Sequence, residues 1–462
     1  MKLHVVLVLS LITALAHGES ALADENWPQW RGPNLDGSSD STDLPTQWGP
    51  DQNIKWSTPL PAWSGGTPII WGDRIFVMTP SAGEQSESSE EAADENEDRQ
   101  QGRRFGRRRG GGGGRNPGGQ TLMVMCISKT DGKVLWEKAL DEGNQLFRKG
   151  NSTSPSPVTD GETVWTVTGN GVVTALDFDG NVKWTRNIQD DYGRFGLNWG
   201  YGSSPLLYDG KLYIEVLHGM RTDEPSYLLA LDGSNGETVF KVDRPTDAVR
   251  ESPDAYTTPA LVETESGPQI VIAGGDYVTG HDPQTGEEIW RSSGLNPRRD
   301  ANFRIIASPV AYNGMVYAPT RVKPLLALKA GGNGDVSDSR LLWKFEGAGG
   351  TDVPTPVIDG NHFFIINDQG IATCLDAETG EVLGGPKRTI SGTVSSSPLL
   401  ADGKIYITNE TGETMVVSAT PDFEELALNP LDGSYTLSSI AVSGNELFLR
   451  TGTHLYCISE SQ

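Results

Sequence analysis

A Ser-Pro or Thr-Pro dipeptide recurs along this chain at intervals that few folds can satisfy. Successive prolines lie 89, 48, 54, 50, 47 and 42 residues apart, and a related Ser-Ser-Ile at 438–440 follows the last of them by 42. The prolines of this series are Pro68, Pro157, Pro205, Pro259, Pro309, Pro356 and Pro398. A period of about 40–50 residues is typical of a propeller blade.

Residues 154–184 show what one repeat contains. Short alternating runs at 156–159, 163–168 and 172–176, and a last run ending at Trp184, are joined by Asp-Gly and Gly-Asn-Gly turns. This pattern predicts a four-stranded antiparallel meander. Because one such sheet cannot bury both faces, it has to stack against its copies. No helical stretch of useful length is present, so the eight repeats predict an all-β, eight-bladed propeller.

The two ends of the chain are expected to share the last blade. The final repeat, residues 439–458, supplies three runs only, and residues 54–57 have the pattern of a missing fourth strand. Pairing these segments would close the ring and remove an exposed sheet edge. The Trp-, Pro- and Gly-rich residues before position 54 are then expected to run extended across the body.

Residues 1–23 are typical of a secretory signal, with a basic start, a short apolar core and a small-x-small site ending at Ala23. The propeller would therefore occupy residues 24–462 of an exported protein in the periplasm or outside the cell. The apolar run of this segment is too short for a good membrane span, and no later stretch approaches the length required. The formal net charge of −24 argues against nucleic acid as a partner. We expect a monomer.

Residues 81–119 interrupt the first repeat between its second and third strands. An acidic stretch runs into an Arg/Gly-rich stretch, a composition that predicts a disordered, solvated loop. The cysteines Cys126, Cys374 and Cys457 each fall in the third strand of a repeat, which predicts small buried residues that do not pair. No Cys or His spacing indicates a metal site.

A motif at the blade ends carries a family resemblance. Residues 126–136, CISKTDGKVLW, share their plan with residues 280–290, GHDPQTGEEIW: a small residue, an Asp, a Gly at a turn and a terminal Trp. This resembles the tryptophan-docking repeat of the pyrroloquinoline-quinone (PQQ) family of eight-bladed propellers. The resemblance implies that the indoles dock blade against blade, and the residues in that position are Trp56, Trp136, Trp184, Trp290 and Trp343.

The family has two branches, and they imply different functions. Quinoprotein dehydrogenases hold PQQ with calcium, many beside a disulfide of adjacent cysteines, but this sequence has no adjacent cysteine pair. The propeller component of the outer-membrane β-barrel assembly machine is a cofactor-free scaffold. We favour a non-catalytic binding propeller for a protein or envelope-polymer partner, with no cofactor. A PQQ-dependent oxidoreductase acting on alcohols or sugars is the alternative, and a glycan-processing propeller is a third.

Ligands of propellers bind over the central channel, at the loops that lead into the innermost strands. Around these loops the sequence places aromatic and charged residues that could stack on a ligand or merely pack the loops: Arg194, Trp199, Tyr201, Asp254, Tyr256, Arg304 and Asp352. Arg148, Lys149 and Glu215 are weaker candidates. Asp254 and Arg304 stand five residues before successive prolines, so we expect an ion pair between them. No catalytic residue is assigned.

Overall fold

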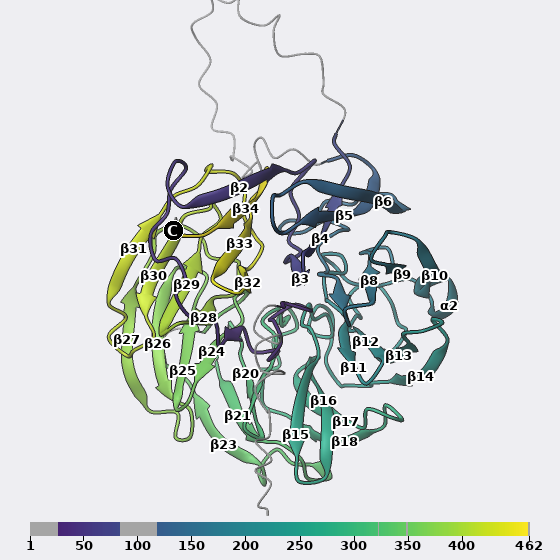
Figure 1. The fold of residues 1–462 in the computed structure, drawn as a ribbon. Helices are drawn as coiled ribbons and strands as arrows, with labels where there is room; N and C mark the ends of the chain where they lie inside the picture. The colour runs from purple at the N-terminus through teal and green to yellow at the C-terminus, as the bar shows by residue number, and fades with distance from the viewer. Residues whose placement is uncertain (1–25, 84–117, 322, 348–349, 461–462) are drawn as a thin grey trace, which may run out of the picture.

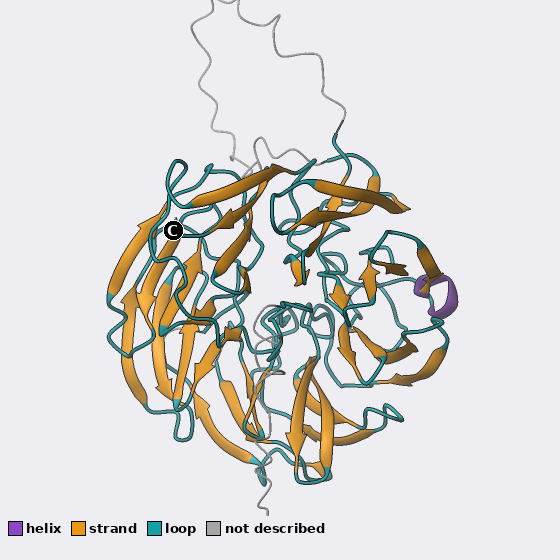
Figure 2. Cartoon of the chain, in the orientation of Figure 1, coloured by secondary structure: helices purple, strands orange, loops and turns teal. Residues whose placement is uncertain are grey.

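The computed structural model describes residues 26–83, 118–321, 323–347 and 350–460. Eight antiparallel sheets stand around a central channel, and nearly all regular structure is strand (Figures 1 and 2). The predicted all-β, eight-bladed propeller is confirmed. The expected signal at 1–23 lies outside the described residues, as does most of the 81–119 segment.

Each blade consists of four strands that follow one another in the chain, with two exceptions: in blade 5 the strand β22 of blade 4 intervenes before the fourth strand, and blade 8 takes its outer strand from the N-terminal part of the chain. Blades 1 to 4 are formed by β3 (Ile69–Trp71), β4 (Arg74–Pro80), β5 (Thr121–Ser128) and β6 (Val134–Glu142); β7 (Val158–Thr159), β8 (Thr163–Val167), β9 (Val172–Asp177) and β10 (Val182–Asn187); β11 (Leu206–Tyr208), β12 (Lys211–Val216), β13 (Tyr227–Asp232) and β14 (Thr238–Asp243); and β15 (Ala260–Thr264), β16 (Gly267–Gly274), β17 (Tyr277–His281) and β18 (Glu288–Ser292).

Blades 5 to 8 are formed by β19 (Val310–Tyr312), β20 (Met315–Ala318), β21 (Leu325–Lys329) and β23 (Leu341–Phe345); β24 (Val357–Asp359), β25 (His362–Ile366), β26 (Ile371–Asp376) and β27 (Val382–Arg388); β28 (Leu399–Ala401), β29 (Lys404–Thr408), β30 (Thr414–Ser418) and β31 (Glu425–Asn429); and β32 (Ala441–Ser443), β33 (Glu446–Arg450), β34 (His454–Ile458) and β2 (Ile54–Pro59). Two short strands, β1 (Ser38–Ser39) and β22 (Gly334–Asp335), add parallel edges to blades 7 and 4. The short helix α2 (Ile188–Tyr192) follows β10.

The ring closes as the sequence predicted. Strand β2 pairs antiparallel with β34, with Trp56 opposite Cys457 and Ile54 opposite Ile458. Without β2, the outer edge of β34 would present unpaired backbone groups to solvent. The three cysteines are buried and unpaired, as expected from their places in the third strands.

The repeated Ser/Thr before each proline has a structural role that the pattern alone did not disclose. The side-chain oxygen of this residue accepts the backbone N–H of its counterpart in the preceding blade, at 2.8–3.1 Å. These bonds link Thr67, Ser156, Ser204, Thr258, Ser308, Thr355, Ser397 and Ser439 in that order. Between blades 8 and 1 the series stops, because Oγ1 of Thr67 is buried without a hydrogen-bond partner. We call the seven accepting side chains, from Ser156 to Ser439, the hydroxyl ring.

Tryptophans dock four of the blades onto their neighbours. The indole N–H of Trp56, Trp136, Trp184 and Trp343 donates to a backbone carbonyl of the next blade at 2.9–3.0 Å. A glycine with positive φ lies under each of these indoles, and a Cβ there would come within 3 Å of the ring, as at Gly132 beneath Trp56. This close approach is why the motif requires glycine.

Trp290 behaves differently from the other docking tryptophans. It is fully buried, and its N–H donates to Oε1 of Gln269 in its own blade at 2.7 Å. The next blade has no short glycine turn to receive the indole, because it joins its third and fourth strands through β22.

Residues 27–39, which we call the N-terminal strap, cross the centre of the ring (Figure 1, purple). The strap exchanges two backbone hydrogen bonds with Ile70 through Trp27, accepts from Thr159 in blade 2, and accepts from Leu400 in blade 7. At its middle the buried guanidinium of Arg31 donates to the carbonyls of Pro356 and Pro398 in blades 6 and 7. The strap therefore ties distant blades together across the channel.

Candidate functional site

The channel forms a funnel of about 380 Å³ whose base is lined by Trp30 of the strap. All seven side chains of the hydroxyl ring line its wall. Loops before the innermost strands and between second and third strands form the mouth, as predicted for a propeller ligand site. The lining residues at this level include Phe147, Arg148, Lys149, Trp199, Tyr201, Tyr256, Arg304, Arg321, Asp352 and Leu437.

A chain of polar contacts runs along one side of the mouth. The indole N–H of Trp199 donates to Oε1 of Glu251 at 2.7 Å, and the same oxygen lies 3.7 Å from Nε of Arg304. Arg304 reaches Oδ2 of Asp352 at 3.7 Å, and Arg321 lies 3.9 Å from that oxygen. The distances between the charges are long for direct hydrogen bonds, so these groups attract one another without saturating their donors and acceptors.

Two tyrosines hold the loop that carries Trp199. The Tyr256 hydroxyl accepts the backbone N–H of Trp199 at 3.0 Å, and the Tyr201 hydroxyl donates to the carbonyl of Glu215 at 3.2 Å. Burial raises the pKa of both tyrosines, so each stays protonated. Trp199 itself is 40% exposed and lines the mouth.

The expected ion pair between Asp254 and Arg304 is wrong. Asp254 is fully buried and accepts the backbone N–H groups of Asn198, Gly219 and Met220 at 2.7–3.0 Å. Its neighbour in sequence, Ala255, does bridge Ile305 of the next blade, so the blade register was predicted correctly. The loop turns the Asp254 carboxylate inward because three amides there need an acceptor. Burial raises the pKa of Asp254 despite these hydrogen bonds.

The remaining sequence candidates divide into two groups. Trp199, Tyr201, Tyr256, Arg304 and Asp352 line the funnel together, whereas Asp254 and the exposed Arg194 lie outside its lining. Lys149, a weaker candidate, lines the mouth and pairs with Glu410 at 3.1 Å. Trp30 and Arg321 were missed. A Trp in the Pro-rich N-terminal segment gave no sign that it would reach the channel.

Glu215 is a buried carboxylate next to this site. Its Oε1 lies 2.7 Å from Oγ1 of Thr257, which also lies 2.9 Å from the carbonyl of Ala273, and its Oε2 has no hydrogen-bond partner. Burial raises the pKa of Glu215 to about 7, although Thr257 and the charge of Arg244 act in the opposite direction.

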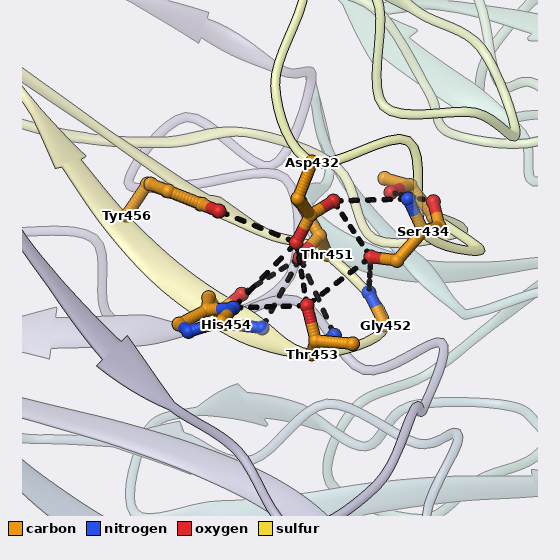
Figure 3. A network of polar contacts seen from close by, with 8 residues as sticks. Asp432, Ser434, Thr451, Gly452, Thr453, His454 and Tyr456 are labelled. Carbon is orange, nitrogen blue, oxygen red and sulfur yellow. Dashed lines mark hydrogen bonds and ion pairs between the residues drawn. The ribbon is translucent and has the colours of Figure 1, made fainter. Parts of the chain in front are cut away.

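A second polar network fixes the loop between blades 7 and 8 at the same end of the ring (Figure 3). Asp432 accepts hydrogen bonds from the hydroxyls of Thr451, Thr453 and Tyr456 at 2.5–3.3 Å, and from the amide and hydroxyl of Ser434. Burial would raise the pKa of Asp432, but the hydrogen bonds from Thr453, Ser434 and Thr451 outweigh it and hold the pKa at about 2. Five donors on one carboxylate make this a structural site.

The family resemblance implies a calcium-linked quinone, which would require calcium ligands in the funnel. Ca²⁺ takes six to eight oxygen ligands, several of them carboxylates. Among the described residues, the funnel lining offers one carboxylate, Asp352, which already lies between two arginines. In the described residues no group of three or more His, Cys, Asp or Glu side chains could hold a metal ion. These residues do not fit a calcium-bridged cofactor.

Fold and docking repeats define the class: this is a PQQ-like repeat β-propeller. The chain belongs to the family described as outer membrane protein assembly factor BamB, whose model matches residues 120–383 and 332–434, more than half of the sequence.

Among curated proteins, a quinohemoprotein alcohol dehydrogenase, ADH-IIG of Pseudomonas putida, is 32% identical over 133 residues. That match covers 26% of this chain and 16% of the other protein, so the chain spans a small part of this relative.

Solved structures of both branches share the fold. BamB from Moraxella catarrhalis has a TM-score of 0.52 at 13% identity, covering 73% of this chain and 94% of that one. A europium-containing methanol dehydrogenase has a TM-score of 0.65 at 9% identity, covering 94% and 98%. The quinohemoprotein alcohol dehydrogenase from Comamonas testosteroni has a TM-score of 0.58 at 10% identity, covering 96% and 82%. At these identities the likeness establishes the fold alone.

No helix within the described ranges has the length and apolarity needed to cross a membrane.

Proposed function

We propose that this chain is an exported, non-catalytic binding propeller that serves as a scaffold for a protein or envelope-polymer partner. The observation that carries the proposal is the funnel, which is lined at its base by Trp30 and presents aromatic and charged side chains at its mouth. Such a concave site with a few convergent polar groups is the usual form of a ligand site. Membership of the BamB family supports the same function.

A quinone-dependent oxidoreductase is the second candidate, favoured by the local similarity to an alcohol dehydrogenase. The poor match between the funnel lining and a calcium site is the reason that we place it second. Adding PQQ and Ca²⁺ to the purified protein, with an alcohol or sugar and an electron-accepting dye, tests this alternative. Dye reduction that requires the quinone would overturn the non-catalytic assignment, and no reduction above the protein-free rate supports it.

Photo-crosslinking in the native cell envelope tests the binding function directly. A photoreactive phenylalanine analogue replaces Trp199 at the mouth or Val239 on β14, two side chains that are 40% and 41% exposed. Because the two side chains are equally exposed, crosslinks formed by random collision should appear equally at both positions. We expect a discrete adduct from position 199 and none from position 239. The same adducts from both positions would contradict a partner site at the funnel.

A further inference from the structure

The hydroxyl ring leaves a set of donors without acceptors inside the funnel. Each ring oxygen accepts one backbone N–H, as described above. A Ser or Thr hydroxyl also carries one proton to donate. Within the described part of the chain, none of the seven ring side chains donates that proton to a protein acceptor. All seven line the cavity, so a ligand that offers acceptor oxygens at this level would meet several donors.

Cationic side chains stand above the ring at the mouth. Lys149, Arg304 and Arg321 line the funnel, with side chains that are 36%, 17% and 32% exposed. Of the lining residues that the structure describes, Asp352 is the one carboxylate. Arg148 also lines the funnel, whereas Glu410 and Glu251, the partners of Lys149 and Arg304, do not. The described lining residues therefore include four cations and one carboxylate, in contrast to the −24 net charge of the whole chain. A cation-rich concavity on an acidic molecule concentrates anions at that place.

The aromatic lining and the volume restrict the shape of the ligand. Trp199, Tyr256 and Phe147 line the mouth, and the N–H of Trp199 is already bound to Glu251, so Trp199 offers a ligand apolar ring carbon rather than a donor. A cavity of about 380 Å³ falls in the range of small-molecule sites, roughly 300–1,000 Å³. It is too small to receive the face of a globular protein, so only a small unit or chain segment of the partner can enter it.

We propose that the funnel binds an acidic sugar unit, a uronate, at the end or side of an anionic polysaccharide. The carboxylate of the sugar faces Arg304, Arg321 and Lys149, its hydroxyls meet the hydroxyl ring, and the C–H face of its ring lies on Trp199. This assignment rests on the proposed binding function and names the ligand class for it. An acidic peptide fits less well, because its backbone N–H groups need a row of acceptors where the wall offers donors and cations.

Titration of the full chain with trigalacturonate, followed by calorimetry and by Trp fluorescence, tests the assignment. We expect saturable binding that weakens as salt is raised, and at least about tenfold weaker binding of maltotriose, a neutral trisaccharide of equal length. Arg321→Gln should weaken trigalacturonate binding by about tenfold, the effect of one charge-assisted contact. Lys344→Gln removes the same charge from an exposed position on β23 and should leave binding unchanged.

Thr258→Val removes a ring hydroxyl with little change in shape and should also weaken binding, with the melting temperature measured to confirm folding. Equal affinity for the charged and neutral trisaccharides, or equal effects of Arg321→Gln and Lys344→Gln, would overturn the proposal. Tighter binding of hexaglutamate than of trigalacturonate would assign the funnel to acidic peptides and overturn the sugar assignment. If the Trp199-position crosslink forms but trigalacturonate does not compete with it, the binding function stands and the ligand class is wrong.

Discussion

Replacing the buried Glu215 by Gln should stabilise the protein in alkaline but not in acidic solution. One hydroxyl proton of Thr257 cannot serve both the Glu215 carboxylate and the carbonyl of Ala273. A protonated Glu215 resolves this conflict, because it donates to Thr257 while Thr257 donates to Ala273. The amide of Gln has the same shape, is neutral at every pH and can donate in the same way.

The magnitude follows from the pKa of Glu215. A rise from 4.5 to about 7 corresponds to about 3 kcal/mol. Because the folded state holds the proton more tightly than the unfolded chain, the stability due to Glu215 is complete below about pH 4.5. It falls as pH rises toward 7 and is lost above that. The advantage of Glu215→Gln over wild type should therefore grow by about 3 kcal/mol between pH 4 and pH 9.

Urea unfolding of both proteins at pH 5, 7 and 9 measures this difference. The pH dependence has to be read from the difference between variant and wild type, because other groups titrate in both proteins. Burial lowers the pKa of His281 to about 4, so His281 reduces the stability of both proteins as pH falls below about 6.5, whereas Glu215 increases that of the wild type. Glu237→Gln, at an exposed turn of the same blade, should show no such growth with pH. A difference between Glu215→Gln and wild type that stays constant from pH 5 to pH 9 would refute the reasoning.

Four further predictions concern the strap, a docking tryptophan, the Asp432 network and residues 84–117. Arg31→Met leaves the carbonyls of Pro356 and Pro398 without their donor and should cost about 3 kcal/mol in urea unfolding; a loss below about 1 kcal/mol would mean that the strap does not need the guanidinium. Trp56→Ala should cost about 2 kcal/mol, less than a fully buried Trp because this indole is half-buried, and an unchanged midpoint would count against docking. Asp432→Asn should lower the free energy of unfolding by about 1 kcal/mol at pH 7, after allowance for solvent screening. The stabilities of variant and wild type should become equal as pH falls from about 4 to 2, because the carboxylate of Asp432 is protonated at its depressed pKa and no longer stabilises the fold. Replacing residues 84–117 with a short Gly/Ser linker should shift the melting temperature by no more than a few degrees, because backbone bonds from Ser81 to Thr121 and from Gly119 to Ser81 already hold the ends together.

The sequence was sufficient to predict the fold because the same local pattern is repeated eight times. Strand ends fell close to their expected positions, as with 172–176 against β9 (Val172–Asp177). Ring closure was also predictable, since a three-strand repeat at one end and a lone strand at the other are complementary. The hydroxyl ring was not recognised, because its hydrogen bonds join residues 42 to 89 positions apart and have no short-range pattern.

The site was predicted in part. The loops of the mouth follow from topology, so Arg304, at the fixed offset before a proline, and Trp199 and Tyr256, beside such positions, were expected where they line the funnel. The direction of a side chain within a loop does not follow from its offset, and for that reason Asp254 was misplaced. Trp30 was missed because it belongs to no repeat, and its position depends on how the strap crosses the channel.

The strap also sets the order in which the molecule can be completed. Arg31 and Pro398 are 367 residues apart in the sequence, and β2 pairs with the last strand of the chain. During synthesis Arg31 and β2 appear early, yet the residues that fix them lie in the last three blades. Contacts of such long range are formed late and slowly. Trp27 and Pro28 can bond to blades 1 and 2 early, but Arg31 and β2 must remain without their partners until blades 6 to 8 exist, so their docking occurs only when the ring has been assembled in full.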